Sequence, residues 1–363
     1  MKNKFIVNSN IEQAYTLPAR FYQDETVYQN VKEKVLLPSW QLVATTDDLP
    51  KNGSLYPFTL LEGSLDEPLL LTRDNNGIIH CLSNVCTHRG KVLVEAPMKK
   101  NGISCGYHGR CFHLDGRFKS MPEFKETLNF PTAEDHLPKV EFATWGKFIF
   151  ASLQPKVPFD TYIEAMKKRL AWFPLDDLIY DAPSSQTYQV NANWALYCDN
   201  YLEGFHVPFI HNRLNQALDF GNYTTETFRY CNLQFALAKK GENCFELPPE
   251  SPDYGQRVFA YYFWLFPNMM FNFYPWGLSL NIVEPLGINQ TRIIFKTYLL
   301  KGKTAADALD THIHETEMED EAVVESVQKG VSSRLYHRGR FSATQEKGVH
   351  HFHTLLADFL NKT

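Results

Sequence analysis

Hydrophobic positions in the first part of the chain, from residue 41 to about residue 153, follow the pattern of short β-strands. Runs of β-branched and aromatic residues at 69–72, 78–82 and 148–152 are separated by turn-forming sequences, among them Asn-Gly and Asp-Gly pairs. Turns of this kind join neighbouring antiparallel strands. The pattern therefore predicts a small antiparallel β-domain over residues 40–155.

The rest of the chain mixes the periods of helices and strands. We expect helices at 162–173 and 193–205, where apolar residues recur at helical spacing. Expected strands follow at 224–237, 258–266, 269–273, 278–283 and 292–300, and expected long helices at 304–329 and 344–361. The predicted fold class is α+β, with long helices laid across an antiparallel sheet. Residues 1–39 and 156–363 are predicted to form this second domain.

Charge and cysteine content exclude several classes of protein. The chain has 36 Lys and Arg against 41 Asp and Glu, so it lacks the basic excess typical of nucleic-acid binding proteins. Seven cysteines in 363 residues are too few for a disulfide scaffold. The apolar run at 5–7 is too short for a signal peptide, and Pro and Asn interrupt the run at 259–276. We therefore expect no membrane span and a cytoplasmic location.

Two cysteines and two histidines in the β-domain have the spacing of metal ligands. Cys86 and His88 are followed, after sixteen residues, by Cys105 and His108, and glycines beside each pair allow tight loops. Structural zinc is one alternative, but zinc fingers pair Cys with Cys and His with His. Loops that each contribute one thiolate and one imidazole suit a Rieske [2Fe-2S] cluster, in which two Cys and two His hold the irons.

A second set of candidate metal ligands lies in the α+β domain. Glu203 and His206 are three residues apart and are expected on one face of a helix, which should end at Pro208, before His211. Two histidines and one carboxylate form the facial triad that binds non-haem Fe(II) and leaves positions open for O2 and substrate. The acidic run at 317–321 offers the carboxylate, but spacing alone does not choose among its members.

These motifs resemble those of the Rieske non-haem iron oxygenases, the aromatic-ring-hydroxylating family, over nearly the whole chain. Residues 86–90, Cys-Thr-His-Arg-Gly, and residues 105–109, Cys-Gly-Tyr-His-Gly, are similar to the two cluster loops of that family. The chain resembles the choline-monooxygenase-like and carnitine-oxygenase-like branch. By this resemblance Asp320, ahead of the Gln-x-Gly stretch at 328–330, is the third iron ligand, with Glu317 as the alternative.

The resemblance also implies an assembly and a source of electrons. Such α subunits have a helix-grip catalytic domain and form C3 homotrimers. A carboxylate, here Glu203, links the cluster ligand His108 of one subunit to the iron ligand His206 of its neighbour, and Asn200 is a further candidate beside the iron. Electrons come from NAD(P)H through a separate reductase, because no Gly-x-Gly-x-x-Gly follows a strand in this chain.

The substrate is the least determined part of the prediction. Ring-dihydroxylating members have Asp at the bridge, so Glu203 favours a quaternary or tertiary amine, hydroxylated or N-demethylated with O2. Aromatic rings bind such cations, and strand alternation turns only every second ring toward a cavity. The candidate substrate contacts are Phe205, Phe263, Phe271, Phe273 and Trp276. The alternatives are dihydroxylation of an aromatic ring and a Rieske electron carrier without catalysis.

Overall fold

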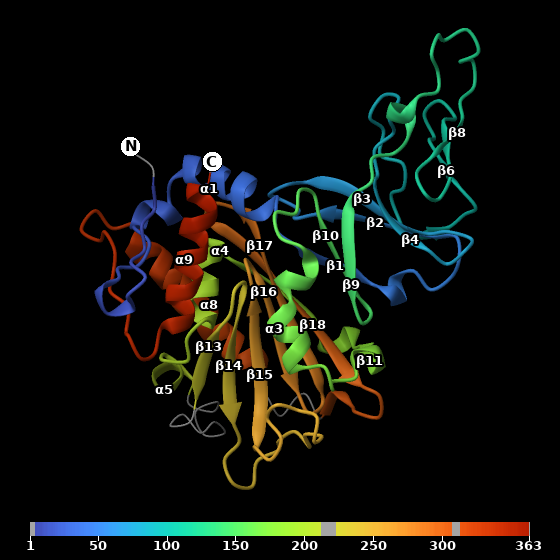
Figure 1. Cartoon of the computed structure of the whole chain (residues 1–363). Coiled ribbons are helices and arrows are strands. Elements are labelled where there is room, and N and C mark those ends of the chain that lie inside the picture. The colour runs from blue at the N-terminus through green and yellow to red at the C-terminus, as the bar shows by residue number, and fades with distance from the viewer. Residues whose placement is uncertain (1–3, 212–222, 307–312, 363) are drawn as a thin grey trace. The chain divides into compact units, whose positions relative to one another are not determined.

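The computed structural model describes residues 4–211, 223–306 and 313–362. The chain forms two compact units, one of Leu37–Lys156 and the other of Met1–Leu36 with Val157–Thr363 (Figure 1). Among the described helices, none combines the length and the apolar character needed to cross a membrane. Each unit has its own core.

The smaller unit consists of short antiparallel strands, as the alternating pattern predicts. One sheet has the order β1 (Gln41–Thr45), β10 (Phe148–Ser152) and β9 (Glu141–Trp145). A second has the order β4 (Ile79–Ser83), β3 (Glu67–Arg73), β2 (Ser54–Leu60) and β5 (Met98–Lys99). The third contains β6 (Ile103–Ser104), β7 (Cys111–Phe112) and β8 (Phe118–Ser120). The loop after β4 and the loop between β6 and β7 carry the Cys and His motif.

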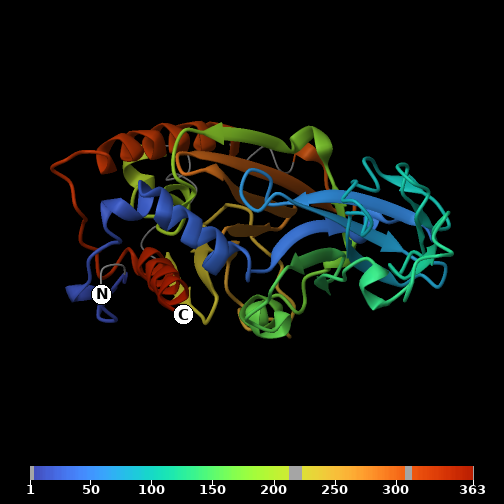
Figure 2. The same cartoon turned by 90° about the horizontal axis from the view of Figure 1, so that it is seen from above.

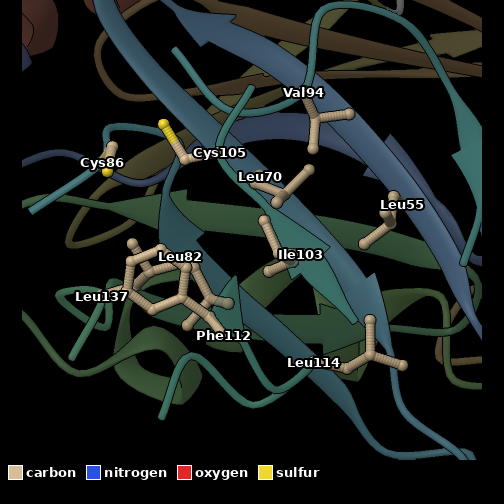
Figure 3. Packing of buried hydrophobic residues seen from close by; sticks show 10 residues of the cluster. All are labelled: Leu55, Leu70, Leu82, Cys86, Val94, Ile103, Cys105, Phe112, Leu114 and Leu137. Carbon is tan, nitrogen blue, oxygen red and sulfur yellow. The ribbon is translucent and has the colours of Figure 1, made fainter. Parts of the chain in front are cut away.

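The core of the smaller unit holds the bases of these two loops in place. Leu70, Leu82 and Phe112 are completely buried there. Cys86 and Cys105 belong to the same cluster, and Figure 3 shows them at one edge of it. Because the apolar side chains fill the space behind them, the two cysteines are fixed next to one another at the edge of a rigid core.

The larger unit is built on a long antiparallel sheet. Its strands run in the order β11 (Leu178–Tyr180), β18 (Gln290–Leu300), β17 (Gly277–Gly287), β16 (Met269–Tyr274), β15 (Val258–Leu265), β14 (Cys231–Leu237) and β13 (Thr224–Thr227), with β12 (Gln186–Val190) also paired to β18. The expected single strand at 224–237 is wrong, because the chain turns between β13 and β14 and the two strands pair with each other. The other expected strands of this sheet are present.

Helices pack on this sheet and on one another. The long helices α8 (Ile313–Val331) and α9 (Lys347–Asn361), red in Figures 1 and 2, both contact α4 (Trp194–Tyr201). α9 also contacts β13, and α4 contacts β17. Close approach is possible because Gly348 of α9 lies against the carbonyl oxygen of Leu202, where a Cβ atom would be only 2.3 Å away.

The shorter helices of this unit depart from the sequence-based ranges. The expected helix at 162–173 is divided into α2 (Phe159–Tyr162) and α3 (Glu164–Arg169). The expected helix at 193–205 ends as α4 at Tyr201, and α5 (Val207–Ile210) follows after a turn. Near the N-terminus, α1 (Glu25–Val31) continues into a π-helical turn, Lys32–Leu36, which contacts α9. The helix-on-sheet architecture is therefore as expected, while helix ends are not.

The two faces of the large sheet differ in chemistry. Tyr262 lies opposite Asn272 in the β15–β16 pair, and Phe263 lies opposite Phe271 one position along. Side chains alternate between faces along a strand, so Tyr262 and Asn272 lie on one face, the polar face, and Phe263 and Phe271 lie on the other, the apolar face. Phe273 of the apolar face makes an edge contact with Phe173, at 5.1 Å between ring centroids. The polar face is therefore available to a cavity.

Candidate functional site

The two loops of the smaller unit repeat the same backbone geometry. The amide of Gly90 donates to the carbonyl of Cys86 (3.0 Å), and the amide of Gly109 donates to the carbonyl of Cys105 (3.1 Å). Both glycines have φ of +73°, a conformation that residues with a Cβ rarely adopt. Each loop therefore folds back tightly over its cysteine and presents the histidine that follows.

The four candidate cluster ligands meet at one place. Cys86 and Cys105 are 3% exposed and unpaired as disulfides, with their thiols within hydrogen-bonding reach, and the rings of His88 and His108 lie 4.8 Å apart. The Nδ1 atom of His108 is buried and has no hydrogen-bond partner in the part of the chain that the structure describes. A buried imidazole nitrogen normally has a partner. An iron ion would supply it, so this donor set fits a Rieske cluster.

Burial and backbone amides act on both cysteine sulfurs. Burial raises the pKa of the Cys86 thiol. Burial also acts to raise the pKa of Cys105, but the backbone amides of Tyr107 and His108 bond its sulfur and bring the pKa below its usual value. Amides that point at a sulfur stabilise the thiolate, which is the form that binds iron.

In the larger unit, three ligand atoms converge from two elements distant in sequence. His206 and His211 flank the short helix α5, and Asp320 lies on α8. Nε2 of His211 is 3.2 Å from Nε2 of His206 and 3.0 Å from Oδ1 of Asp320, and Nε2 of His206 is 3.5 Å from the same oxygen. Neighbouring ligands of an octahedral ion with bonds of about 2.1 Å lie about 3.0 Å apart. The spacing therefore matches three adjacent positions on one metal ion.

Carboxylates fix the orientation of both imidazoles. Oε1 of Glu203 lies 2.6 Å from Nδ1 of His206, and Oε2 of Glu319 lies 2.7 Å from Nδ1 of His211. A carboxylate only accepts hydrogen bonds, so each Nδ1 carries the proton and each Nε2 presents a lone pair to the metal position. Three electron-rich atoms facing one another repel unless a cation lies among them. This arrangement fits mononuclear iron.

The electrostatics of His211 are consistent with a cation at this position. Burial acts to lower the pKa of His211, but Asp320 and Glu319 outweigh it and raise the pKa above its usual value. The same two carboxylates that favour a proton on the imidazole also favour a metal ion in its place. His211 is 2% exposed, so this charge is shielded from solvent.

Two expectations about the helix at this site are wrong. Glu203 and His206 do not share a helical face, because α4 ends at Tyr201 and Glu203 lies in the turn before α5. Pro208 does not end the helix but occupies the first turn of α5, where its missing amide leaves no helical bond unmade. The turn still brings the two side chains into contact, through the backbone amide of His206 as well as its ring.

Glu317, the alternative ligand, lies elsewhere on the cavity wall. Its Oε2 accepts from the hydroxyl of Tyr197 (2.7 Å), and its Oε1 has no partner among the described residues. Burial raises the pKa of this carboxyl well above its usual range. Asp320, not Glu317, lies with the two histidines. The roles of Glu317 and Glu319 could not be separated from spacing, since both lie in the same acidic run.

A cavity of about 150 Å³ adjoins the three converging ligands. Asn200, Glu203 and Glu317 line it. The sheet contributes its polar face, with Gln234, Tyr262, Asn272, Tyr274, Ser279, Asn281 and Phe295. Tyr197, Tyr201 and Tyr223 complete the aromatic part of the lining.

None of the five aromatic residues expected to contact substrate lines this cavity. Phe263, Phe271 and Phe273 are completely buried on the other face of the sheet. Phe205 is 47% exposed, and Trp276 borders a different surface hollow. The alternation of residue types along β16 did indicate which positions face the cavity. Polar Asn272 between two phenylalanines marks which face of β16 meets a polar cavity.

Comparison with known proteins bears on both units. Residues 39–134 match the family model described as the Rieske [2Fe-2S] domain, and residues 180–362 match the ring hydroxylating alpha subunit, catalytic domain. Choline monooxygenase of Arabidopsis thaliana is 30% identical over 95% of this chain and 83% of its own length. The carnitine monooxygenase oxygenase subunit of Escherichia coli K12 is 30% identical over 96% of this chain and 95% of its own length.

Solved structures share the fold. The quaternary ammonium Rieske monooxygenase CntA in complex with L-carnitine has a TM-score of 0.80 at 23% identity, covering 98% of this chain and 99% of CntA. Naphthalene 1,2-dioxygenase from Rhodococcus sp. has a TM-score of 0.77 at 17% identity, covering 95% of this chain and 94% of that enzyme. Both extend over almost the whole chain.

Proposed function

Because the chain belongs to the α subunits of the Rieske non-haem iron oxygenases, which carry a Rieske cluster and mononuclear iron, we propose that it monooxygenates a small amine. The observation that carries this proposal is the convergence of His206, His211 and Asp320 beside a tyrosine-lined cavity. We propose residues 40–155 as the cluster domain, and residues 1–39 with 156–363 as the catalytic domain.

The site residues divide into two sets. Cys86, His88, Cys105 and His108 would hold the cluster, and His206, His211 and Asp320 would hold the iron. When bound, the iron activates O2 with electrons that the cluster delivers. Glu203 and Glu319 keep the histidine protons on Nδ1, and Asn200 lies on the wall of the cavity that the three proposed iron ligands also line.

We propose that electrons cross between subunits of a C3 homotrimer. The carboxylate of Glu203 accepts a hydrogen bond from His206, and it could accept a further one from His108 of a neighbouring copy. Phe205, directly before His206, is 47% exposed, and Phe209, three residues after it, is 75% exposed. Tyr107, directly before His108, is 57% exposed. Exposed aromatic rings next to each centre favour contact with another protein surface. The solved structure of a quaternary ammonium Rieske monooxygenase with the same fold gives insights into inter-subunit electron transfer in that enzyme.

The electrons would come from a separate NAD(P)H-dependent reductase. The Escherichia coli relative is named as the oxygenase subunit of its enzyme, which implies another component there. A cytoplasmic location is proposed on the ground that all seven cysteines are free, as in a reducing compartment.

The chemistry of the cavity supports a cationic substrate. Tyrosine rings can bind an ammonium group by cation–π contact, each worth about 0.5 to 2 kcal/mol. No Lys or Arg occurs among the described residues that line the cavity. A cation therefore has aromatic partners here, whereas a carboxylate on the substrate has no cationic partner among these residues. An amine without an acidic group, similar to choline, fits this lining better than carnitine or an apolar arene.

The test is turnover with a surrogate reductase and a panel of choline, carnitine and naphthalene. We expect formaldehyde or hydroxylated amine from choline-like compounds, with one oxygen atom of 18O-labelled O2 in the oxygenated product. Tyr262→Leu should weaken amine binding, while Tyr180→Leu, at a half-exposed position outside the cavity, should not. A cis-dihydrodiol from the arene without amine turnover would refute the proposal and establish the dioxygenase alternative.

A further inference from the structure

A buried arginine follows directly after the second cluster loop. Arg110 is 2% exposed, an unusual degree of burial for a guanidinium group. Its Nη2 donates to Oδ1 of Asp135 at 2.6 Å and to the backbone oxygen of Asp135 at 3.1 Å. The rings of Phe118 and Phe130 lie within 5.1 and 5.5 Å of the guanidinium carbon. The positive charge is therefore fixed in position and removed from water.

The same aspartate reaches the first cluster loop. The hydroxyl of Thr87, between Cys86 and His88, donates to the backbone oxygen of Asp135 at 3.0 Å. Thr87 and Arg110 thus share one acceptor atom, so their two donor atoms are no more than about 6 Å apart. Arg110 belongs to the second loop, and Thr87 to the first. Asp135 therefore ties both loops together and places the guanidinium charge close to the cluster position.

The charge has a defined effect on an electron carrier. Adding one electron to a cluster held by two thiolates and two neutral imidazoles increases its negative charge by one unit. A fixed positive charge nearby stabilises the product of that reduction more than the reactant. The low polarity of the surroundings, with three aromatic rings near the guanidinium, keeps this interaction from being screened. Asp135 is partly exposed, so its opposing charge is better screened than that of Arg110.

We propose that Arg110 is a positioning residue that raises the reduction potential of the cluster, with Asp135 holding it against both loops and moderating its charge. The inference rests on the assignment of the cluster to these loops. The electron itself comes from the reductase, and no protein group is oxidised or reduced. The residue would set how readily the cluster accepts an electron and how readily it passes the electron to iron.

The experiment compares reduction midpoint potentials of the full chain loaded with its cluster, measured by redox titration followed by visible absorption and EPR. Arg110→Met should lower the midpoint, and Arg110→Lys, which keeps the charge, should stay near the original chain. Asp135→Asn should shift the midpoint upward. Arg117→Met is the matched control, because Arg117 also pairs with an aspartate but is 67% exposed.

The midpoint shifts expected for Arg110→Met and Asp135→Asn have opposite directions, which distinguishes an effect of charge from an effect of structure. A purely structural role predicts shifts in one direction, or cluster loss, for both members of the pair. The proposal is overturned if Arg110→Met retains the cluster with an unchanged midpoint, or if Asp135→Asn lowers it. If Arg110→Met fails to retain the cluster, the other two variants decide the question. Arg110→Lys should then leave the midpoint near that of the original chain, and Asp135→Asn should raise it. Absence of Rieske absorption in the unmodified chain would instead refute the assignment of the cluster itself.

Discussion

Removal of the Glu319 carboxylate should weaken iron binding without removing a ligand. Glu319 lies 2.7 Å from Nδ1 of His211, whose Nε2 faces the metal position. Loss of such a partner typically costs 10- to 100-fold in metal affinity. The Glu319 side chain is 42% exposed, so solvent screens part of its effect and we expect the lower end, about tenfold. Tenfold corresponds to about 1.4 kcal/mol of binding free energy.

The assay is the iron content of Glu319→Ala after equilibration with a graded series of chelator concentrations. Rieske absorption reports the cluster separately, so the titrating iron is the mononuclear ion. Asp320→Asn, which alters a ligand, should lose iron at a lower chelator concentration than Glu319→Ala. Met318→Ala is the control, since Met318 is a half-exposed neighbour on the same helix.

Two outcomes would refute this reasoning. If Glu319→Ala kept its iron as tightly as Met318→Ala, the contact with His211 would have no role in binding the metal. If Asp320→Asn kept its iron while Glu319→Ala lost it, the carboxylate ligand would be misassigned.

Three further predictions follow from other contacts. Glu203→Gln should retain iron and a reducible cluster but slow the oxidation of the reduced cluster in the presence of substrate and O2, measured by stopped-flow absorption. Gly348→Ala should lower the free energy of unfolding by about 1 to 3 kcal/mol, because the new Cβ would lie 2.3 Å from the oxygen of Leu202. Gly330→Ala on α8, with no atom near the new Cβ, should instead stabilise by up to about 1 kcal/mol. Burial lowers the pKa of His351 to about 4. Between about pH 4 and 6.5 the unfolded chain therefore binds more protons than the folded chain. The free energy of unfolding should fall as the pH falls through this window, by at most about 3 kcal/mol.

Each of these has a contrary result. Cluster oxidation at the original rate in Glu203→Gln would exclude the carboxylate from the electron path. Equal melting temperatures for the two glycine variants would show that α9 can move away from α4 at little cost. An unchanged pH dependence of urea unfolding in His351→Phe would show that other groups control acid stability.

Sequence pattern predicted the sheet and the ligands for different reasons. Strand alternation is local, so runs such as those of β15 and β16 were identified without knowledge of their neighbours. The candidate Cys and His ligands could be proposed because metal chemistry restricts residue type and spacing. Helix ends were misplaced where tertiary contacts decided them, as at Tyr201, where α4 stops although the apolar pattern continues.

The cavity could not be predicted in the same way. Polar Asn272 between two phenylalanines indicates which face of β16 meets the cavity, but sequence alone does not show which residues of the neighbouring strands lie beside it. The role of Glu319 depended on which side of His211 it approaches, which spacing along a helix does not determine. Lining residues such as Tyr262 and Asn281 therefore emerge only from the assembled sheet.

The position of the iron ligands along the chain has a consequence for protein turnover. His211 precedes the strands β13 to β18, and Asp320 follows them, so a bound ion acts as a cross-link that closes a loop containing most of the sheet. A ligand that binds only the folded chain adds to its stability in proportion to the logarithm of ligand concentration. The lifetime of this polypeptide in the cell should therefore depend on iron supply. Iron-starved cells should lose the protein itself by degradation, and not only its iron-dependent activity.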